Sequence, residues 1–146
     1  MSSDAKIERL AGIPLFAGSR PRELEAIARL CTEVSVPAGR TQCREGEMGQ
    51  EFFVLEEGTV AVTVGGREVS TLGPGEFFGE LALLDAGPRN ATVTAQTPVR
   101  VLVVSRQEFS GLLEEDPIVA VRMLPAVGAR LRQQAAAHAA KQSPVV

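Results

Sequence analysis

The chain has 146 residues, of which 45% are hydrophobic and 23% charged, and its formal net charge is −3. These proportions are typical of one folded globular domain, and the acidic balance, with lysines and arginines scattered along the chain, argues against a surface that binds nucleic acid. No apolar run approaches the roughly 18–20 residues needed to span a bilayer, and a single histidine, His138, excludes a metal site built on histidine clusters.

The cysteine content indicates a reducing compartment. Two cysteines, Cys31 and Cys43, are too few for a disulfide scaffold, and the N-terminus does not resemble a secretion signal. We therefore expect a cytoplasmic protein in which both thiols are reduced and pack as small core residues.

The chain is expected to begin with a helical segment over residues 1–31. Leu24, Ile27 and Ala28 lie at helical spacing, and Pro21 suits the first turn of a helix.

The pattern changes to strands between residues 32 and 105. Glycines and prolines recur through this region and separate short runs such as Val60–Val64, where apolar residues alternate with smaller or polar ones. The continuously apolar run 52–55 is typical of a central strand, and Gly65-Gly66 predicts a tight hairpin. Many short strands separated by turns predict a mainly β fold with flanking helices, arranged as an antiparallel β jelly-roll, or double-stranded β-helix.

Helical signals return in residues 106–142. Ser105 with Glu108 matches a capping box, and Asp116 followed by Pro117 is a second helix start. Residues 143–146 are expected to form a frayed tail.

The last helix carries an apolar pattern with an interruption. Leu124, Val127 and Leu131 are expected to mark one apolar face. Pro125 lacks an N–H and disfavours a helical conformation at the residue before it, and Gly128 weakens the same turn, so we expect a kink or hinge at 124–128.

The stretch 78–93 carries the most specific chemistry. Gly79 allows a sharp turn, and the first turn of a short helix over 80–84 would leave main-chain N–H groups to bind an anion. Arg89 follows a Gly-Pro turn and can add a forked, charge-assisted contact to phosphate oxygens. Glu80 would repel a phosphate but can accept a hydrogen bond from a sugar hydroxyl. The set therefore fits a ligand that carries an anion beside a hydroxyl.

This stretch resembles the phosphate-binding cassette of cyclic nucleotide-binding domains, which occur in catabolite activator protein, in the regulatory subunit of protein kinase A and in cyclic nucleotide-gated channels. The similarity rests on the sequence 78–84 followed by Pro88-Arg89-Asn90-Ala91-Thr92-Val93. It extends upstream through 13–16, 23–24, 38–39, 44–46 and 53–55 with Gly58, and covers roughly residues 7–135.

The resemblance implies roles for individual residues. Glu80 would bind the ribose 2′-hydroxyl, and Arg89 would bind the exocyclic phosphate oxygens. The ligand-binding set it implies is Phe78, Gly79, Glu80, Leu81, Ala82, Arg89, Asn90 and Ala91, with Arg130 as a base-capping side chain on the lid helix after Asp116. Asn90 stands where a small or hydroxyl residue is usual, which leaves the choice of base open.

The function we expect is that of a regulatory sensor without enzymatic activity, which binds a cyclic nucleotide, cyclic AMP before cyclic GMP, and signals by movement of its C-terminal helices. No catalytic residue, metal or cofactor is expected, and the partners are the small-molecule ligand and a second copy or an effector protein in trans, without nucleic acid or membrane. One alternative is a degenerate family member that acts only as a protein-interaction module. A cupin-type enzyme is the other alternative, and it lacks the inward histidines that such a site needs. As an isolated pair, Glu80 and Arg89 would be no more than a solvated ion pair worth about 0–1 kcal/mol.

Overall fold

A computed structural model describes residues 3–83 and 87–141 of the chain. Within these ranges the side chains of residues 3, 80, 81, 130, 131 and 133–141 fall outside the described part. The helices and 3-10 turns are α1 (Ser3–Ala11), η1 (Pro14–Phe16), α2 (Pro21–Leu30), η2 (Glu80–Leu83), α3 (Arg106–Glu115) and α4 (Pro117–Lys141). The strands are β1 (Thr32–Val36), β2 (Thr41–Cys43), β3 (Met48–Gly49), β4 (Glu51–Glu57), β5 (Val60–Val64), β6 (Arg67–Leu72), β7 (Phe77–Phe78), β8 (Gly87–Pro88), β9 (Thr92–Ala95) and β10 (Val99–Ser105).

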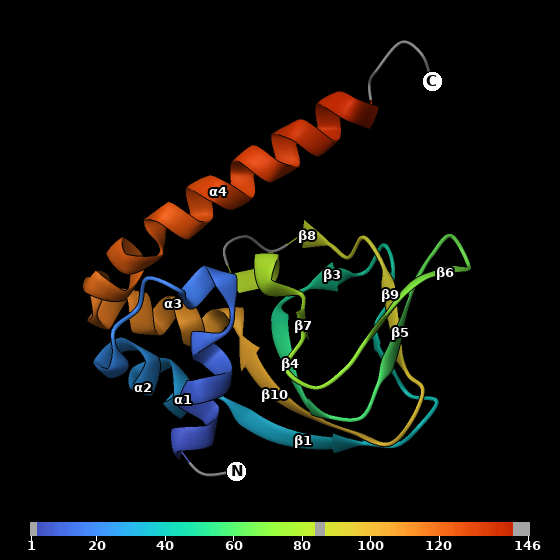
Figure 1. Ribbon diagram of the computed structural model, residues 1–146, viewed down its shortest axis with the longest axis horizontal. Coiled ribbons are helices and arrows are strands. Elements are labelled where there is room, and N and C mark those ends of the chain that lie inside the picture. The colour runs from blue at the N-terminus through green and yellow to red at the C-terminus, as the bar shows by residue number, and fades with distance from the viewer. Residues whose placement is uncertain (1–2, 84–86, 142–146) are drawn as a thin grey trace.

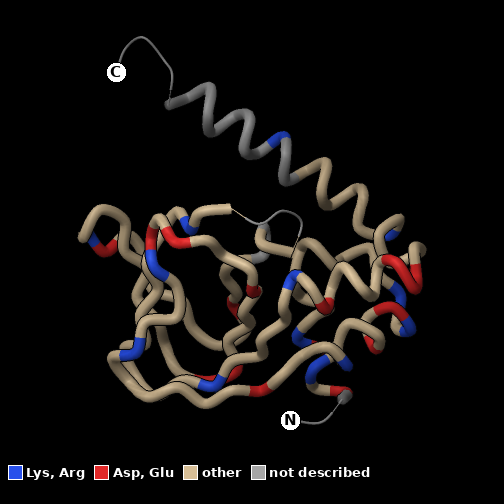
Figure 2. The backbone as a smooth tube through the Cα atoms, turned by 180° about the vertical axis from the view of Figure 1, so that it is seen from behind, with Lys and Arg blue, Asp and Glu red and all other residues tan. Residues whose placement is uncertain are grey.

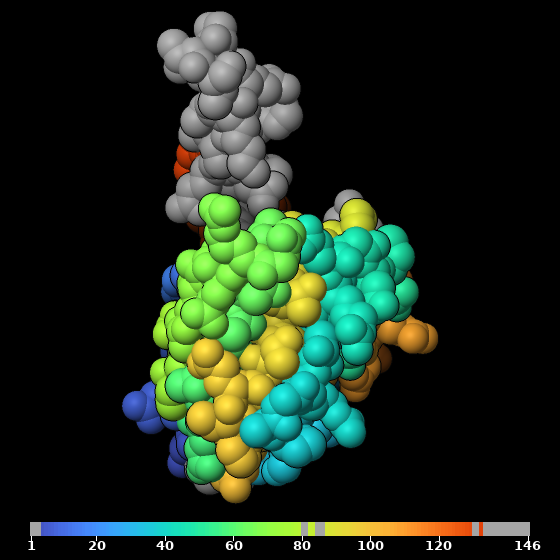
Figure 3. Space-filling view, turned by 90° about the vertical axis from the view of Figure 1, so that its right-hand side faces the viewer, coloured from blue at the N-terminus to red at the C-terminus, as the bar shows by residue number. Residues whose placement is uncertain are grey.

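The strands form an antiparallel roll of two four-stranded sheets and a two-stranded ribbon. Sheet A has the order β1-β10-β4-β7, sheet B the order β2-β9-β5-β6, and the ribbon pairs β3 with β8. In Figure 3 sheet B faces the viewer, with the green β5–β6 hairpin beside yellow β9 and cyan β2. The mainly β fold with flanking helices is confirmed.

Strand chemistry explains the roll. β4 carries the run Phe52–Leu55, and every residue of this run is buried, so both faces of the strand are covered, as the apolar run predicts. The hairpin at Gly65 and Gly66 is also confirmed, since φ is +59° and +80° there, a conformation that glycine adopts without steric cost.

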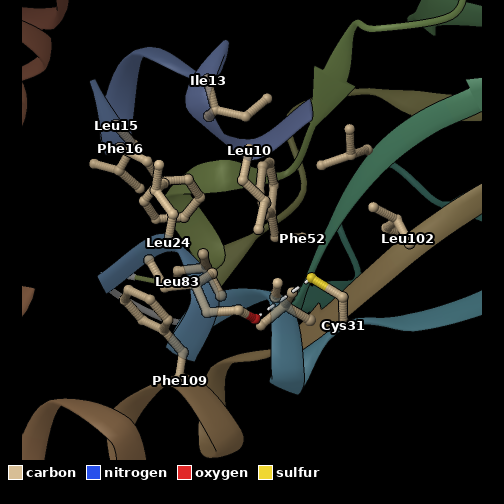
Figure 4. Packing of buried hydrophobic residues seen from close by; sticks show 14 of the residues in the cluster. Leu10, Ile13, Leu15, Phe16, Leu24, Cys31, Phe52, Leu83, Leu102 and Phe109 are labelled. Carbon is tan, nitrogen blue, oxygen red and sulfur yellow. Dashed lines mark hydrogen bonds between the residues drawn. The ribbon is translucent and has the colours of Figure 1, made fainter. Parts of the chain in front are cut away.

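The core has two parts, one on each face of sheet A. Alternation along β4 sends Phe53 and Leu55 into the roll and Phe52 and Val54 outward to the helices. Figure 4 shows the outer cluster, in which Phe16 packs edge-on against Phe52, with ring centroids 6.1 Å apart. Leu83 of η2 belongs to this cluster, so the turn after Gly79 is held by the same core that packs the helices.

The helices gather at one end of the roll, and α4 extends away from them above β8 in Figure 1. Ser105 caps α3 by accepting the Glu108 N–H at 3.1 Å, and α4 begins at Pro117, so both predicted starts are confirmed. None of the helices in the described ranges is both long and apolar enough to cross a membrane.

Two details of α4 differ from the expectation. Residues 117–141 form one helix in which Leu124, the residue before Pro125, remains helical, because one missing N–H removes only one ladder bond. The expected kink or hinge at 124–128 stays a prediction. Leu124 is exposed. The residues of α4 that pack on the outer core are instead spaced four apart along the helix: Val119, Met123 and Val127. The other member of the predicted stripe, Leu131, has a side chain outside the described part.

Both cysteines are free and buried, as expected from their number. Cys31 lies in the outer cluster and Cys43 inside the roll.

Candidate phosphate-binding site

Main-chain hydrogen bonds fix the backbone of Arg89 against the turn before β3. The N–H of Arg89 donates to the Glu47 carbonyl at 2.7 Å, and the Arg89 carbonyl accepts from the Gly46 N–H at 2.8 Å. These bonds continue the β3–β8 ribbon and hold the arginine between two elements distant in the sequence.

The guanidinium of Arg89 packs closely between Gly49 and Gly79. A Cβ atom at Gly49 would lie 2.3 Å from Arg89 Nε, and one at Gly79 would lie 2.6 Å from Arg89 Nη1. Gly79 also has φ of +80°, which disfavours any side chain there. The glycines leave a space that the guanidinium fills.

Two further contacts orient the guanidinium. Arg89 Nη2 donates to the main-chain carbonyl of Glu51 at 2.8 Å, and Arg89 Cζ lies 5.9 Å from the centroid of the Phe53 ring. A guanidinium has five N–H donors in a rigid fork, and the bond to Glu51 occupies one of them. The contacts preorganise a cation whose fork geometry matches two phosphate oxygens.

Phe78 supports this arrangement from the core. Its ring stacks on Phe53 with centroids 4.7 Å apart and planes 15° apart, and the two residues pair across β7 and β4. The structure places the Phe78 side chain in the core of the roll. Its contribution to the site is therefore to hold the Phe53 ring in place under Arg89.

The turn after Gly79 is a 3-10 helix, η2. Its buried members are Ala82 and Leu83, and the Ala82 N–H donates to the Gly79 carbonyl at 3.1 Å. This amide, expected to offer itself to a ligand, therefore has an internal partner in this structure. The side chains of Glu80 and Leu81 lie outside the described part, so the expected carboxylate–ribose contact falls on atoms of which the structure gives no account.

The segment after Arg89 leads into sheet B. Asn90 is exposed and Ala91 is half-buried. The Thr92 hydroxyl accepts from the Glu45 N–H at 3.0 Å, and the Glu45 carboxylate accepts from the Gly65 N–H at 2.9 Å. Glu45 thus ties the tip of the β5–β6 hairpin to the end of the cassette, a role that no pattern in the sequence indicated.

Arg89 also borders an open hollow of about 520 Å³, and the residues that line it include Cys43, Glu47 and Glu51. Cys43 is buried at its wall, and burial raises the pKa of its thiol while the nearby Arg89 charge acts in the opposite direction. The thiol therefore stays neutral and behaves as a small apolar group beside the guanidinium.

The expected lid is anchored to the N-terminal helices. Arg122 Nε of α4 lies 3.3 Å from the buried carboxylate of Glu23, which also accepts the Arg20 N–H at 3.0 Å. A Cβ at Gly18 would lie 2.7 Å from the Arg122 carbonyl, so α4 and the turn after η1 are in close contact. The backbone of Arg130 lies in α4, and its side chain is outside the described part.

Comparison with known proteins identifies the family of this chain. The family model described as "Cyclic nucleotide-binding domain" matches residues 33–116, more than half of the chain. The chain belongs to the cyclic nucleotide-binding domain family.

The relatives of this cyclic nucleotide-binding domain are proteins of different kinds. The chain is 40% identical over 111 residues to a cyclic nucleotide-gated potassium channel of Mesorhizobium japonicum, covering 76% of this chain and 31% of the channel. It is 32% identical over 129 residues to the cyclic AMP receptor protein of Thermus thermophilus, covering 85% of this chain and 60% of the receptor. The chain thus spans a third to three fifths of the length of these relatives.

A solved structure matches over nearly its full length. It is the N-terminal domain of a transcriptional regulator from Streptomyces coelicolor, with a TM-score of 0.78 and 36% identity, and the match covers 88% of this chain and 93% of that one. The recognition of the family from residues 78–93 is therefore confirmed.

Proposed function

We propose that this domain binds cyclic AMP as a regulatory sensor, without enzymatic activity, and passes the signal on through its C-terminal helices. The observation that carries the proposal is the Arg89 guanidinium, held by the Glu51 carbonyl at 2.8 Å between Gly49 and Gly79. A cation held in this way loses little conformational entropy when an anion binds, and each charge-assisted hydrogen bond contributes about 1.5–3 kcal/mol.

Within this proposal, the cyclic phosphate accepts from Arg89, and Glu80 accepts the neighbouring ribose hydroxyl. Main-chain groups of Gly79, Leu81 and Ala82 line the turn, and Asn90 and Ala91 flank the phosphate. Arg130 approaches the base from α4. The Ala82 amide must exchange its bond to the Gly79 carbonyl for a ligand contact if it takes part, which couples binding to a change in η2.

The coupling to the helices runs through the outer core. Leu83 of η2 packs in the same cluster as Phe109 of α3 and Met123 of α4. A shift of η2 on binding therefore favours a different packing of α3 and α4, and the difference in contact energy between the two packings is the signal.

The output partner is a second copy of the chain or an effector protein. Val121 and Leu124 are exposed by 53% and 62% on α4, which extends beyond the roll. The charges do not indicate nucleic acid as a partner of this part of the chain, since lysines and arginines are interspersed with acidic residues along the described trace in Figure 2.

Isothermal titration calorimetry with cyclic AMP, cyclic GMP and linear AMP tests the proposal. We expect a dissociation constant near micromolar for cyclic AMP, since about 0.3–0.4 kcal/mol per heavy atom gives roughly −7 to −8 kcal/mol for a ligand of this size. Arg89→Ala should weaken binding by about 1.5–3 kcal/mol. Arg44→Ala is the matched control, because Arg44 lines the same hollow without the contacts to Gly49 and Gly79.

Two outcomes would refute the proposal. Equal affinity in Arg89→Ala and the unmodified protein would remove the phosphate role of Arg89. Absence of heat with either cyclic nucleotide, in protein shown to be folded by circular dichroism, would favour a domain that acts only through protein contacts.

A further inference from the structure

A carboxylate that the proposed ligand site does not use is buried on the outer face of sheet A. Glu56 is 3% exposed, and neither of its carboxylate oxygens has a hydrogen-bond donor among the described residues. It follows Phe52 and Val54 along β4 at alternate positions, so its side chain points toward the helices and away from the roll interior. An ionised carboxylate without donors at such a place costs several kcal/mol.

A second carboxyl group faces Glu56. Glu33 lies on the outer face of β1, two strands away, and is within hydrogen-bonding reach of Glu56. Arg100 of β10 lies between them in the sheet, with Nε 3.7 Å from Glu33 and Nη1 3.0 Å from the exposed Glu57. Two carboxyl groups can form a hydrogen bond with each other only when one of them carries a proton.

A proton fits this pair better than a metal ion does. In the described ranges no three or more His, Cys, Asp or Glu side chains are grouped so that they could hold a metal. Burial raises the pKa of Glu56 and the charge of Glu33 raises it further, while the positive charges of the amino terminus and of Arg100 act in the opposite direction. The amino terminus and, more weakly, Arg100 lower the pKa of Glu33, so Glu56 is the member that takes the proton.

Helix α1 covers Glu56, whereas Glu33 is exposed. Arg9 Nη2 donates to the main-chain carbonyl of Glu56 at 3.3 Å, and Lys6 Nζ donates to the Cys31 carbonyl at 3.4 Å, so both cations contact main-chain carbonyls. Leu10 of α1 packs in the outer cluster with Phe52 and with Leu83 of the cassette, as Figure 4 shows. Docking of α1 thus buries Glu56 and also supports η2.

We infer that Glu56, buried beneath α1, shares one proton with the exposed Glu33, which makes the docking of α1 on sheet A depend on proton uptake. When α1 undocks, Glu56 meets water and releases the proton. Because Glu56 has a raised pKa in the docked state, the stabilisation is fully present below its ordinary pKa of 4.5 and is lost as pH rises through the docked-state value. Alkaline conditions therefore loosen α1 and, through Leu10 and Leu83, the cassette.

Amide hydrogen exchange of α1 between pH 5 and pH 8 tests the inference. After correction for the intrinsic exchange rate, the opening equilibrium of α1 should rise about tenfold for each pH unit between the undocked and docked pKa values of Glu56. In Glu56→Gln, which mimics the neutral acid, this slope should vanish. Glu57→Gln removes the same charge from the next residue, which is exposed, and should keep the slope. An α1 opening equilibrium as flat in the unmodified protein as in Glu56→Gln would overturn the inference.

A second measurement separates this inference from the proposed function. Only the effect of α1 on the cassette rests on the proposed function. The dissociation constant for cyclic AMP should rise with pH in the unmodified protein more steeply than in Glu56→Gln. A protein that binds no cyclic nucleotide at any pH would sink the proposed function, whereas the slope of α1 exchange would still decide the proton linkage. Equal pH dependence of binding in both proteins, with the exchange slope present, would overturn the link from α1 to the cassette.

Discussion

Substitution of Gly49 by alanine isolates the packing around Arg89. The new Cβ would lie 2.3, 2.5 and 2.6 Å from Arg89 Nε, Cζ and Cδ, closer than non-bonded atoms approach, so the guanidinium must leave its place. Gly49 does not have a positive φ, so alanine adds no backbone strain of the kind expected in the left-handed region. The effect of the substitution is therefore steric.

The magnitude follows from the contacts that Arg89 would lose. The hydrogen bond to the Glu51 carbonyl involves a charged donor and contributes about 1.5–3 kcal/mol, and the contact with the Phe53 ring adds about 0.5–1 kcal/mol. Since Arg89 is half-buried and regains water when displaced, we expect Gly49→Ala to lower the free energy of unfolding by about 1.5–3 kcal/mol. Cyclic AMP affinity should fall with it.

The chain supplies a matched control. Gly87 pairs with Gly49 across the β3–β8 ribbon, and a Cβ there would meet nothing within 4 Å. Gly87→Ala should therefore change stability by less than about 0.5 kcal/mol, because the added methyl group meets no other atom.

Urea denaturation of the single and double variants decides the matter. In an Arg89→Ala background there is no guanidinium to displace, so Gly49→Ala should cost little there, and the two substitutions should show a coupling energy. An unchanged cost of Gly49→Ala in that background would show that the alanine clashes with something other than Arg89, and the account of this site would fail.

The remaining predictions concern the anchor of α4 and a buried thiol. Glu23→Gln keeps the hydrogen bond to the Arg20 N–H but loses the ion pair with Arg122, so we expect urea denaturation to show a free energy of unfolding lower by about 1 kcal/mol. Glu23→Ala loses both interactions and should lower it by about 2–3 kcal/mol. Equal effects of the two variants would contradict the double role of Glu23. Burial raises the pKa of Cys31 to about 11, so that about one molecule in a thousand carries the thiolate at pH 8. Alkylation of Cys31 by iodoacetamide at that pH should thus be at least about 100-fold slower than in urea-unfolded protein, and mass spectrometry showing equal rates would contradict the burial.

The sequence predicts the roll where local chemistry decides it. The alternating valines of β5, the apolar run of β4 and the paired glycines at 65–66 each require a particular backbone, and the structure has it. Leu124 is the instructive exception: it stays helical before Pro125, because the local preference imposed by the proline is weaker than the packing of Met123 and Val127 on the outer core. Tertiary contacts of this kind have no signature within a short window of sequence.

In the site, too, local sequence predicts some features, and tertiary contacts determine the others. Gly79 and Arg89 stand out in the sequence as a turn and a free cation, and the structure brings them into contact. The partners of Arg89 at Glu47 and Glu51 could not be predicted, because they act through main-chain carbonyls and any residue type supplies one. Gly49 carries no motif of its own, and only its distance to Arg89 reveals why it lacks a side chain.

The reliance of Arg89 on main-chain partners has a consequence for how this loop can vary. Side chains at positions 47 and 51 can change widely without disturbing the carbonyls that hold the arginine. Removal or insertion of one residue between 46 and 51 would instead shift the spacing of those carbonyls by about 3.3 Å, the rise of a strand residue, and leave the guanidinium without its acceptors. Natural variation at positions 47 and 51 should therefore appear as exchanged residue types within a segment of constant length.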